Sequence, residues 1–568
     1  MILASVLAAL ILSSPNADKV DPRQRSYVMP SRIVASSRDC GRLLEPKFGQ
    51  VSEGRFLDSG APVLTATNDF VLVDFGRELH GGVAIGCGAA TAGDCRVRLV
   101  FGESVGEAMS RLGEKGAQQC HAIRDVTLTA PWCGVLEFGN TGFRFLKIEL
   151  PEGGALQLDS VRAVSLMRPM TAQGGFRCSD ERLNAIWNTA VRTVHLCAQD
   201  YIWDGIKRDR LVWQGDMHPE VTSLLAVFGA DPVIADSLDY MARTTEPDKW
   251  MNGMPSYSMW WILCLHDLWF HTGDLSFARA NAGYFAKTVA HLAGCVGEDG
   301  SWSFDGSWSR DGFLDWPTQH NQPAVKAGMC GLFIRAMESA RALAVALGDD
   351  ATAALCVRTA ANLRKVVPEP HGAKSAAALL ALSGLREPRT MFDEILGRNG
   401  TDGVSTFYGY YMLEAMSAAD ETPYAIGVAR DYWGAMLDMG ATSFWEDFNV
   451  CWTNDATRLD EMPVVGKKDI HGDFGDFCYV GFRHSLCHGW SSGPAAWLIH
   501  RVLGVRILEP GAAKVEVRPC LSGLEWAEGA LATPKGPVRV RAERVSGRLQ
   551  VDVSAPDGVQ VVRGDRCE

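Results

Sequence analysis

Hydrophobic and polar positions follow two different periods along this chain, and the period changes twice. In the N-terminal part, short apolar or alternating runs lie between glycine-rich turns, as is typical of β-strands. The clearest runs predict strands over residues 71–76, 96–101 and 143–148. Residues 21–172 are therefore expected to form a β domain.

A helical period follows. Apolar residues over 181–198 recur at steps of three and four, which places them on one face of a helix. Similar patterns predict helices over 328–347, 351–366 and 374–385. The helical domain is expected over 173–503, a length that holds about twelve ordinary helices with their loops. Periodicity alone does not distinguish a helical barrel from another helical array.

The β pattern returns at the C-terminal end. Clean alternation over 514–517, 538–541 and 549–553 predicts strands with one buried face. We expect residues 504–568 to form a small closing β-sandwich. The chain is thus predicted to be a multidomain α+β protein.

Composition narrows the class of protein. The chain has 568 residues, of which 47% are hydrophobic and 21% charged, and this describes a folded protein of two to four domains. Its net charge of −12 argues against nucleic acid as the main partner. The 16 cysteines are scattered without metal-ligand spacing, so most are expected to be isolated thiols. We predict no metal site and no cofactor, although structural calcium stays open because it needs no linear motif.

The first residues have the character of a leader. Residues 1–14 are apolar and are followed by small residues and then charged ones, which indicates a secretory signal within 1–20. The chain is therefore expected to be exported, to the periplasm or outside the cell. The positive residues that usually precede such a segment are missing, so a cytoplasmic protein with a buried helix here is the alternative. No stretch is long enough to predict a membrane span.

The segment 203–216 (WDGIKRDRLVWQGD) holds most of the candidate chemistry. It places three carboxylates, a lysine, two arginines and two tryptophans in fourteen residues. Sugar sites use this mixture, because aromatic rings stack on the C–H faces of a pyranose while charged groups hold its hydroxyls. The segment resembles the acidic signature of the α-L-rhamnosidases of glycoside hydrolase family 78, which often runs Asp-Cys-Pro-x-Arg-x-Glu-Arg-x-Gly-Trp-x-Gly-Asp.

A second segment supports the same resemblance. Residues 440–446 (GATSFWE) are similar to the Gly-Ala-Thr-x-x-Trp-Glu that carries the other catalytic acid of this family. The resemblance implies an (α/α)6 barrel as the catalytic domain, preceded by a β-sandwich and followed by a small one. It also implies catalysis by two carboxyl groups, a general acid at Asp209 and a general base at Glu446. In an inverting glycosidase such groups lie about 6.5–9.5 Å apart on opposite faces of the sugar.

The match at Asp209 is not complete. Counted back from Arg210, Asp209 takes the place of the general-acid glutamate, but the distance from Asp204 is one residue shorter than in the signature. The two adjacent arginines would also lower the pKa of this carboxyl, whereas a general acid needs a raised one. Asp204 and Asp216 therefore stay open as alternative proton donors.

The resemblance and the local clusters of aromatic and polar residues together give a set of expected sugar contacts. In the segment 484–490, His488 takes the position of a family histidine that binds rhamnose hydroxyls. Trp316 follows Asp315, which resembles the Asp-Trp element of the family's sugar pocket. The expected contacts are Asp204, Arg208, Trp213, Asp216, Trp260, Trp261, Trp316, Trp445 and His488.

The function that this resemblance implies is release of terminal α-linked L-rhamnose from a glycan or glycoside, with inversion. The expected partner is a carbohydrate with a terminal rhamnose. Two alternatives stay open: a glycosidase for another α-linked deoxyhexose, and a barrel that binds glycans after losing catalysis.

Overall fold

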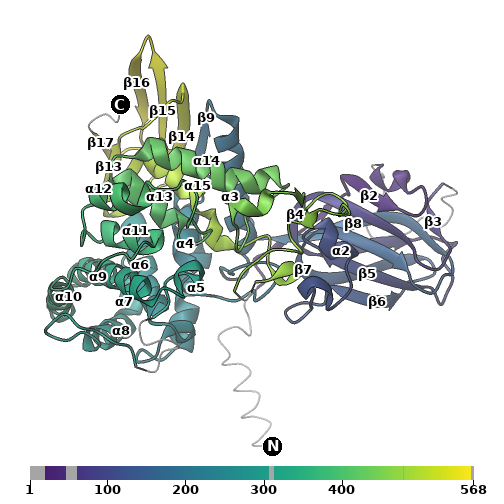
Figure 1. Cartoon of the computed structure of the whole chain (residues 1–568), viewed down its shortest axis with the longest axis horizontal. Helices are drawn as coiled ribbons and strands as arrows, with labels where there is room; N and C mark the ends of the chain where they lie inside the picture. Colours follow the sequence, from purple (N-terminus) through teal and green to yellow (C-terminus); the bar gives the residue numbers. More distant parts are fainter. Residues whose placement is uncertain (1–19, 46–59, 306–311, 478, 565–568) are drawn as a thin grey trace, which may run out of the picture.

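The computed structural model describes residues 20–45, 60–305, 312–477 and 479–564. The first 19 residues of the predicted leader lie outside this range. Figure 1 shows three parts in sequence order: a β domain on one side, a helical domain beside it, and C-terminal strands above the helices. This is the predicted order of domains. Within the described residues, no helix is long and apolar enough to cross a membrane.

The N-terminal domain is an antiparallel β structure with its own apolar core. One hydrogen-bonded path runs β1–β8–β4–β7–β5–β6, with β2 paired to β4 and β3 to β8. Apolar side chains of the long strands alternate into a core that is separate from the core of the helical domain. The strands are β1 (Gln24–Val28), β2 (Arg32–Ser36), β3 (Val63–Leu64), β4 (Asp69–Cys87), β5 (Arg96–Gly102), β6 (Asp125–Thr129), β7 (Gly134–Leu150) and β8 (Leu156–Met167).

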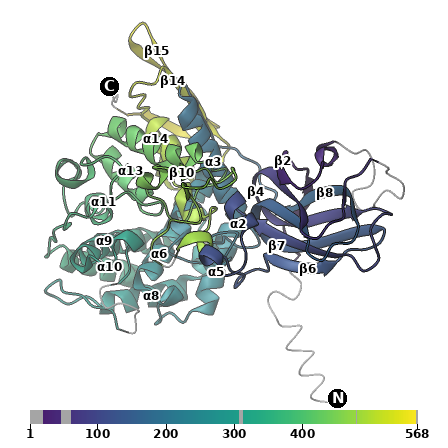
Figure 2. The same cartoon turned by 45° about the vertical axis from the view of Figure 1, so that its right-hand side comes forward.

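A short helix of this domain reaches the helical domain. Helix α2 (Val105–Met109) follows β5 directly, and Ser104 caps it by accepting the N–H of Glu107. Figure 2 shows α2 at the junction of the two domains. The backbone N–H of Val105 donates to the carbonyl of Leu459 at 2.8 Å, so the start of α2 is joined to a loop of the barrel.

Six outer and six inner helical segments alternate along the described chain, which confirms the predicted six-hairpin domain. The inner segments contact one another in sequence order, and the last contacts the first, so they close a ring. The inner segments are α4 (Met217–Val227), α6 (Pro255–Thr272), α9 (Gln322–Leu347), α11 (Lys374–Leu382), α13 (Gly409–Ala418) and α15 (Pro494–Trp497, continued by a π-helical turn, Leu498–Val502). The outer segments are α3 (Glu181–Cys197), α5 (Pro232–Thr244), α8 (Ala282–Gly294, after the short α7, Ser276–Ala280), α10 (Asp350–Leu363), α12 (Pro388–Met391, continued by a π-helical turn, Phe392–Leu396) and α14 (Thr422–Asp438).

Capping side chains and glycines set the ends of several of these helices. Asp180, Asp231 and Asp349 each accept a backbone N–H at a helix start. Gly273 and Gly348 end α6 and α9 in the left-handed region, at φ 72° and 77°, where a residue with a Cβ is strained. Because every inner helix follows an outer one, the loops that enter the inner helices meet at one end of the barrel.

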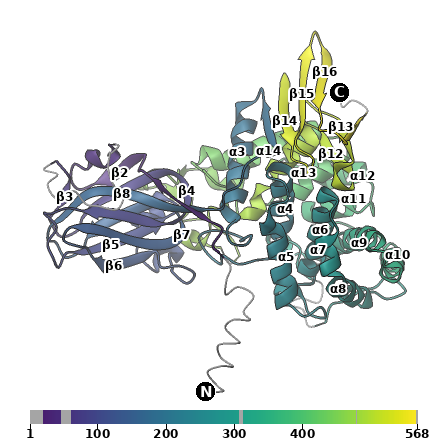
Figure 3. The same ribbon diagram turned by 180° about the vertical axis from the view of Figure 1, so that it is seen from behind.

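The C-terminal strands form two small sheets above the barrel (Figure 3). One sheet has the order β12–β13–β17 and the other β16–β15–β14–β9. Strand β9 (Gly175–Cys178) precedes the helices, so it lies within the range expected to be helical and yet completes the C-terminal sheet by pairing with β14. The remaining strands are β12 (Val505–Glu509), β13 (Lys514–Val517), β14 (Trp526–Leu531), β15 (Val538–Val545), β16 (Arg548–Ser554) and β17 (Gln560–Arg563). Every cysteine among the described residues is a free thiol.

Candidate active site

A pocket of about 300 Å³ opens at the end of the barrel where the loops enter the inner helices. Its wall combines four carboxyl groups and one imidazole with a set of aromatic rings. The lining residues are Asp204, Asp209, Trp213, Asp216, Asn252, Gly253, Met254, Tyr257, Phe313, Trp316, Glu446, Tyr479, His488 and Trp490. The pocket thus has the concave, largely apolar wall with a few polar groups that is typical of small-molecule sites.

Backbone hydrogen bonds bring three distant segments together at this pocket. The N–H of Glu446 donates to Ser485 (3.0 Å), the N–H of His488 to Phe444 (2.9 Å), and the N–H of Gly489 to Asp204 (2.7 Å). The segments 204–205, 444–446 and 485–489 therefore lie side by side, and both sequence motifs contribute to one site.

Asp209 lies on a strained turn. Asp209 and Arg210 both have a positive φ, 53° and 55°, which costs energy for residues that carry a Cβ. The β domain holds this turn: Arg210 donates to the carbonyl of Asn140 at 2.8 Å and to that of His121. The ring of His121 lies 3.2 Å from the carboxylate of Asp209. The side chain of Asp209 keeps 19% of its surface exposed and faces the pocket.

Glu446 is buried and held at both of its oxygens. Arg208 Nη2 donates to Oε1 at 3.0 Å, and the N–H of Ser485 donates to Oε2 at 3.1 Å. The same Nη2 atom lies 3.9 Å from the carboxylate of Asp209. Since both carboxylates lie within 4 Å of one nitrogen, at 3.0 and 3.9 Å, the two groups are close enough to act on one sugar ring.

His488 lies among the acids without being charged. Its Nε2 is 3.7 Å from Asp204, 3.8 Å from Asp216 and 3.5 Å from Glu446. Burial, with the nearby Arg208 charge, holds the pKa of His488 well below its ordinary value. A neutral imidazole at this point can exchange hydrogen bonds with hydroxyl groups in the pocket.

Two of the three aspartates have a strongly raised pKa. Burial is the main cause for both Asp204 and Asp216, and the neighbouring carboxylates raise the pKa of each further. Tyr257 donates to Asp216 at 3.2 Å, and the N–H of Leu211 donates to Asp204 at 2.9 Å. Both carboxyls are thus fixed in place and favour their protonated form.

Comparison with protein families matches two parts of the chain. Residues 171–371 match the six-hairpin glycosidase domain of bacterial α-L-rhamnosidases, and residues 504–562 match the C-terminal domain of the same enzymes. These two parts of the chain are similar to domains of bacterial α-L-rhamnosidases. A search of curated proteins finds no match.

Solved rhamnosidase structures share the fold of this chain. The family 78 rhamnosidase of Bacillus sp. GL1 has a TM-score of 0.71 at 21% identity, over 92% of this chain and 55% of that one. The α-L-rhamnosidase of Dictyoglomus thermophilum has a TM-score of 0.70 at 17% identity, over 96% and 59%. A Klebsiella oxytoca rhamnosidase with rhamnose bound has a TM-score of 0.65 at 21% identity, over 84% and 96%. The chain thus spans a little over half the length of the first two structures.

The six-hairpin domain places six of the nine expected sugar contacts around this pocket. Asp204, Trp213, Asp216, Trp316 and His488 line it, and Arg208 reaches it through Glu446. The two expected catalytic residues, Asp209 and Glu446, also line it.

The three other expected contacts, Trp260, Trp261 and Trp445, lie in the core and do not line this pocket. Trp260 is 1% exposed and stacks on Tyr411, whereas Trp261 is fully buried and donates from Nε1 to the carbonyl of Leu238. Trp445 is also fully buried and packs edge-on against Phe448. The sequence around a tryptophan does not tell whether its ring faces the pocket or the core.

Several pocket residues escaped the sequence analysis. Tyr479 lies under the Arg208 guanidinium at 4.5 Å and contacts Trp316 edge-on. Tyr257 contacts Trp213 in the same way and donates to Asp216. Trp490 follows His488 by two residues. This closeness in sequence to the histidine expected to bind the sugar could have predicted Trp490 as a pocket residue. Tyr257 and Tyr479 carry no such signal.

Proposed function

We propose that this protein is an inverting α-L-rhamnosidase. The observation that carries the proposal is the arrangement of Asp209 and Glu446, which face one pocket from two loops and contact the same nitrogen of Arg208. Two carboxyl groups in one pocket are what glycoside hydrolysis requires. The six-hairpin glycosidase domain around them supports rhamnose as the sugar.

In the proposed reaction Glu446 is the general base. Arg208 and the N–H of Ser485 fix its orientation, so one oxygen can accept a proton from a water on one face of the sugar ring. That water attacks the anomeric carbon as the glycosidic bond breaks. The released sugar then has the inverted configuration.

Asp209 is proposed to be the general acid. Of the three aspartates it is the most exposed, and it lies on the turn that the β domain holds beside the pocket. Asp204 and Asp216 are both nearly fully buried, so we assign them to the sugar hydroxyls instead. A protonated carboxyl both donates and accepts, which suits a hydroxyl partner.

The apolar part of the wall supports a deoxy sugar. Met254, Phe313 and Trp316 line the same pocket as the acids, and a methyl group gains free energy against such a surface whereas a hydroxymethyl group loses hydration there. L-Rhamnose differs from L-mannose by this one hydroxyl.

The experiment that tests the proposal is hydrolysis of a panel of p-nitrophenyl glycosides: α-L-rhamnoside, α-L-mannoside and α-L-fucoside. We expect the rhamnoside to have the highest kcat/KM, with the mannoside lower by roughly 10- to 100-fold, since one extra polar group against an apolar wall is worth about that much. Glu446→Gln is the control, and it should bind rhamnose without turnover.

Two results would contradict the proposal. Faster hydrolysis of the fucoside would point to another deoxyhexose. Rhamnose binding by calorimetry without hydrolysis of any rhamnoside, including natural rhamnose-capped glycans, would indicate a binding protein.

A further inference from the structure

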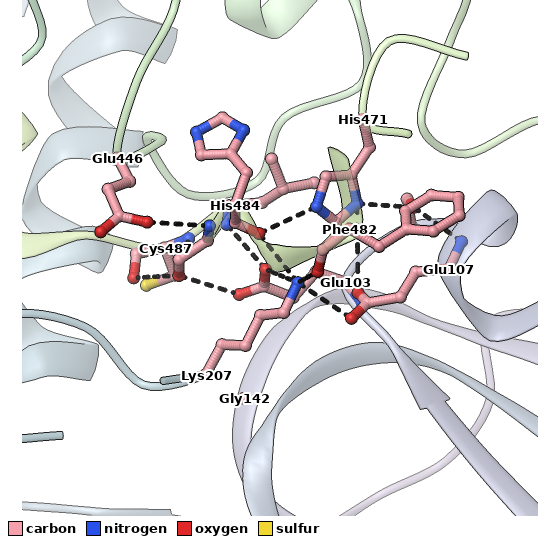
Figure 4. A network of polar contacts seen from close by, with 12 residues as sticks. Glu103, Glu107, Gly142, Lys207, Glu446, His471, Phe482, His484 and Cys487 are labelled. Atoms are coloured by element: carbon pink, nitrogen blue, oxygen red, sulfur yellow. Dashed lines mark hydrogen bonds and ion pairs between the residues drawn. The ribbon is translucent and has the colours of Figure 1, made fainter. Parts of the chain in front are cut away.

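A buried polar network joins the N-terminal β domain to the loop behind Glu446 (Figure 4). Its central residue, Glu103, lies between β5 and α2 and is only 1% exposed. One Glu103 oxygen accepts the N–H of Leu486 at 2.7 Å, and the other accepts the Ser485 hydroxyl at 3.3 Å. An acidic side chain from one domain thus binds two successive residues of another.

The loop that Glu103 holds is the one that holds Glu446. Ser485 donates its N–H to Glu446 Oε2 at 3.1 Å and accepts the N–H of Glu446 at its carbonyl at 3.0 Å. Only one residue therefore separates the carboxylate of Glu103 from the proposed base. A shift of Ser485 would move both the side-chain and the backbone contact of Glu446.

Lys207 fixes the preceding part of the same loop. Its ammonium donates to the carbonyls of Phe482 (2.7 Å) and His484 (2.8 Å), and it lies 3.3 Å from Glu103 and 2.9 Å from Glu107. Lys207 belongs to the acidic segment 203–216, so the network also reaches the loop of Asp209. All these groups are buried, where a hydrogen-bonded charge is strong and an unpaired one is costly.

His471 completes the network in a single tautomer. Its Nε2 faces the carbonyl of His484 at 2.9 Å and must donate, so Nδ1 accepts the hydroxyl hydrogen of Ser104 at 2.8 Å. Burial lowers the pKa of His471 well below its ordinary value, which agrees with the neutral ring.

This cluster is not a metal site. Ligand atoms of Glu103, Glu107 and His471 lie within 4.8 Å of one another, a spacing that a metal ion could use. The Lys207 ammonium, however, lies against both carboxylates, and both His471 nitrogens already have partners. The positive charge that a metal would supply is provided by lysine.

We propose that Glu103 is a positioning residue of the active site, which holds Glu446 in place through Ser485 and Leu486. The β domain is then part of the catalytic unit and not a separate module. This inference rests on the proposed function, because it takes Glu446 as the base. A second contact agrees with it: His121 of the β domain lies against the carboxylate of Asp209, so the domain touches the loops of both proposed catalytic residues.

The test compares Glu103→Ala with Glu107→Ala, its matched control. Both variants remove a buried carboxylate from Lys207. Glu107 also accepts the backbone N–H of Glu103, but among the described residues no hydrogen bond joins Glu107 to residues 485–486. We expect Glu103→Ala to lower kcat on p-nitrophenyl α-L-rhamnoside by about 10- to 100-fold, as misplacement of a catalytic group does. The Kd for rhamnose should stay within about twofold, because the pocket wall itself is untouched.

The control and a conservative variant separate positioning from stability. Glu107→Ala should lower Tm about as much as Glu103→Ala while changing kcat far less. Glu103→Gln should recover most of the lost kcat, since its amide oxygen can still accept from Leu486. Equal losses of kcat in Glu103→Ala and Glu107→Ala, in proportion to their losses of Tm, would overturn the proposal.

Hydrogen exchange tests the Glu103 contact independently of the proposed function, because it does not require the protein to hydrolyse a substrate. Hydrogen exchange of the peptide containing residues 482–488 should become faster in Glu103→Ala than in Glu107→Ala, because the N–H of Leu486 loses its acceptor. If the wild type hydrolyses no rhamnoside, the proposed function fails, and the exchange difference still tests the contact. Unchanged exchange in Glu103→Ala would contradict the positioning role.

Discussion

Arg208 donates a 3.0 Å hydrogen bond to Glu446 across 238 residues of sequence, and Glu446 lines the pocket. The Arg208 guanidinium also lies over the ring of Tyr479 at 4.5 Å, so its plane is fixed on a second side. Nearby carboxylates, Glu446 first among them, outweigh burial and raise the pKa of this arginine. Arg208 is therefore a permanent charge that orients the proposed base.

Replacing Arg208 tests this relationship. Arg208→Lys keeps the charge but loses the planar group that stacks on Tyr479, so we expect kcat to fall by about 10- to 100-fold with a small change in Tm. Arg208→Ala leaves the buried Glu446 without its ion-pair partner and should also lower the free energy of unfolding by about 3–5 kcal/mol. Steady-state kinetics and calorimetry measure both. Full activity in either variant would remove Arg208 from the mechanism.

The proton donor is identified by comparing leaving groups. A p-nitrophenolate leaves with little protonation, whereas an alkyl alcohol requires a general acid. Asp209→Asn should therefore lose several orders of magnitude in kcat on a methyl α-L-rhamnoside and far less on the p-nitrophenyl substrate. Asp204→Asn and Asp216→Asn should lose activity on both substrates alike, mainly through KM, because these residues are assigned to hydroxyls. If the leaving-group dependence appears in one of those two variants, that residue is the acid.

Replacing Trp316 and Trp260 compares a tryptophan at the pocket with one in the core. Trp316 lines the pocket, so Trp316→Ala should raise the Kd for rhamnose, by roughly 5- to 50-fold for the loss of one stacked ring, with little effect on Tm. Trp260 is buried against Tyr411 and His218, so Trp260→Ala should lower the free energy of unfolding by about 3–5 kcal/mol. A raised Kd for rhamnose in the milder variant Trp260→Phe, at unchanged Tm, would show that Trp260 contributes to sugar binding.

Asp315 should make stability depend on pH in a definite direction. Burial raises the pKa of Asp315 to about 7, although Ser405 donates to it. The folded protein therefore holds this proton over a range in which the unfolded chain, with a pKa near 3.8, has lost it. The stabilising contribution is complete below the unfolded pKa and is lost as the pH rises toward 7.

Asp315→Asn removes this titration. Its Tm should fall less than that of the wild type between pH 4.5 and pH 8, as measured by calorimetry in both proteins. Glu103 and Asp447 also have raised pKa values, about 7 for each, and both are present in the two proteins that are compared. A parallel Tm profile in the variant would show that Asp315 does not titrate in this range.

Many strands and helices could be predicted from the sequence because they are set locally, whereas the barrel was implied by the family resemblance. Alternation over 514–517 and helical spacing over 181–198 each correspond to an element with nearly the same bounds, β13 and α3. Strand β9 shows the limit. Its partner β14 lies about 350 residues later, and a four-residue strand before a helix has no local signal for such a pairing.

The proposed catalytic residues could be located because each lies in a compact motif. Asp209 and Glu446 are both surrounded by charged and aromatic neighbours in sequence, and the barrel brings these two segments together. Tyr479 and Glu103 could not be found, since each acts across a domain or loop contact that only the folded chain creates. Sequence does not tell which way a ring points, so it could not show that Trp260 and Trp445 are buried in the core.

The most direct test of the central claim is proton NMR of the sugar first released from an α-L-rhamnoside. A carboxylate that activates a water and a carboxylic acid that protonates the leaving group predict β-L-rhamnose as the first product, followed by slow mutarotation to the equilibrium mixture. First release of α-L-rhamnose would contradict the inverting mechanism and the role of Glu446 as a base. Release of no rhamnose from any rhamnoside would contradict the proposed activity itself.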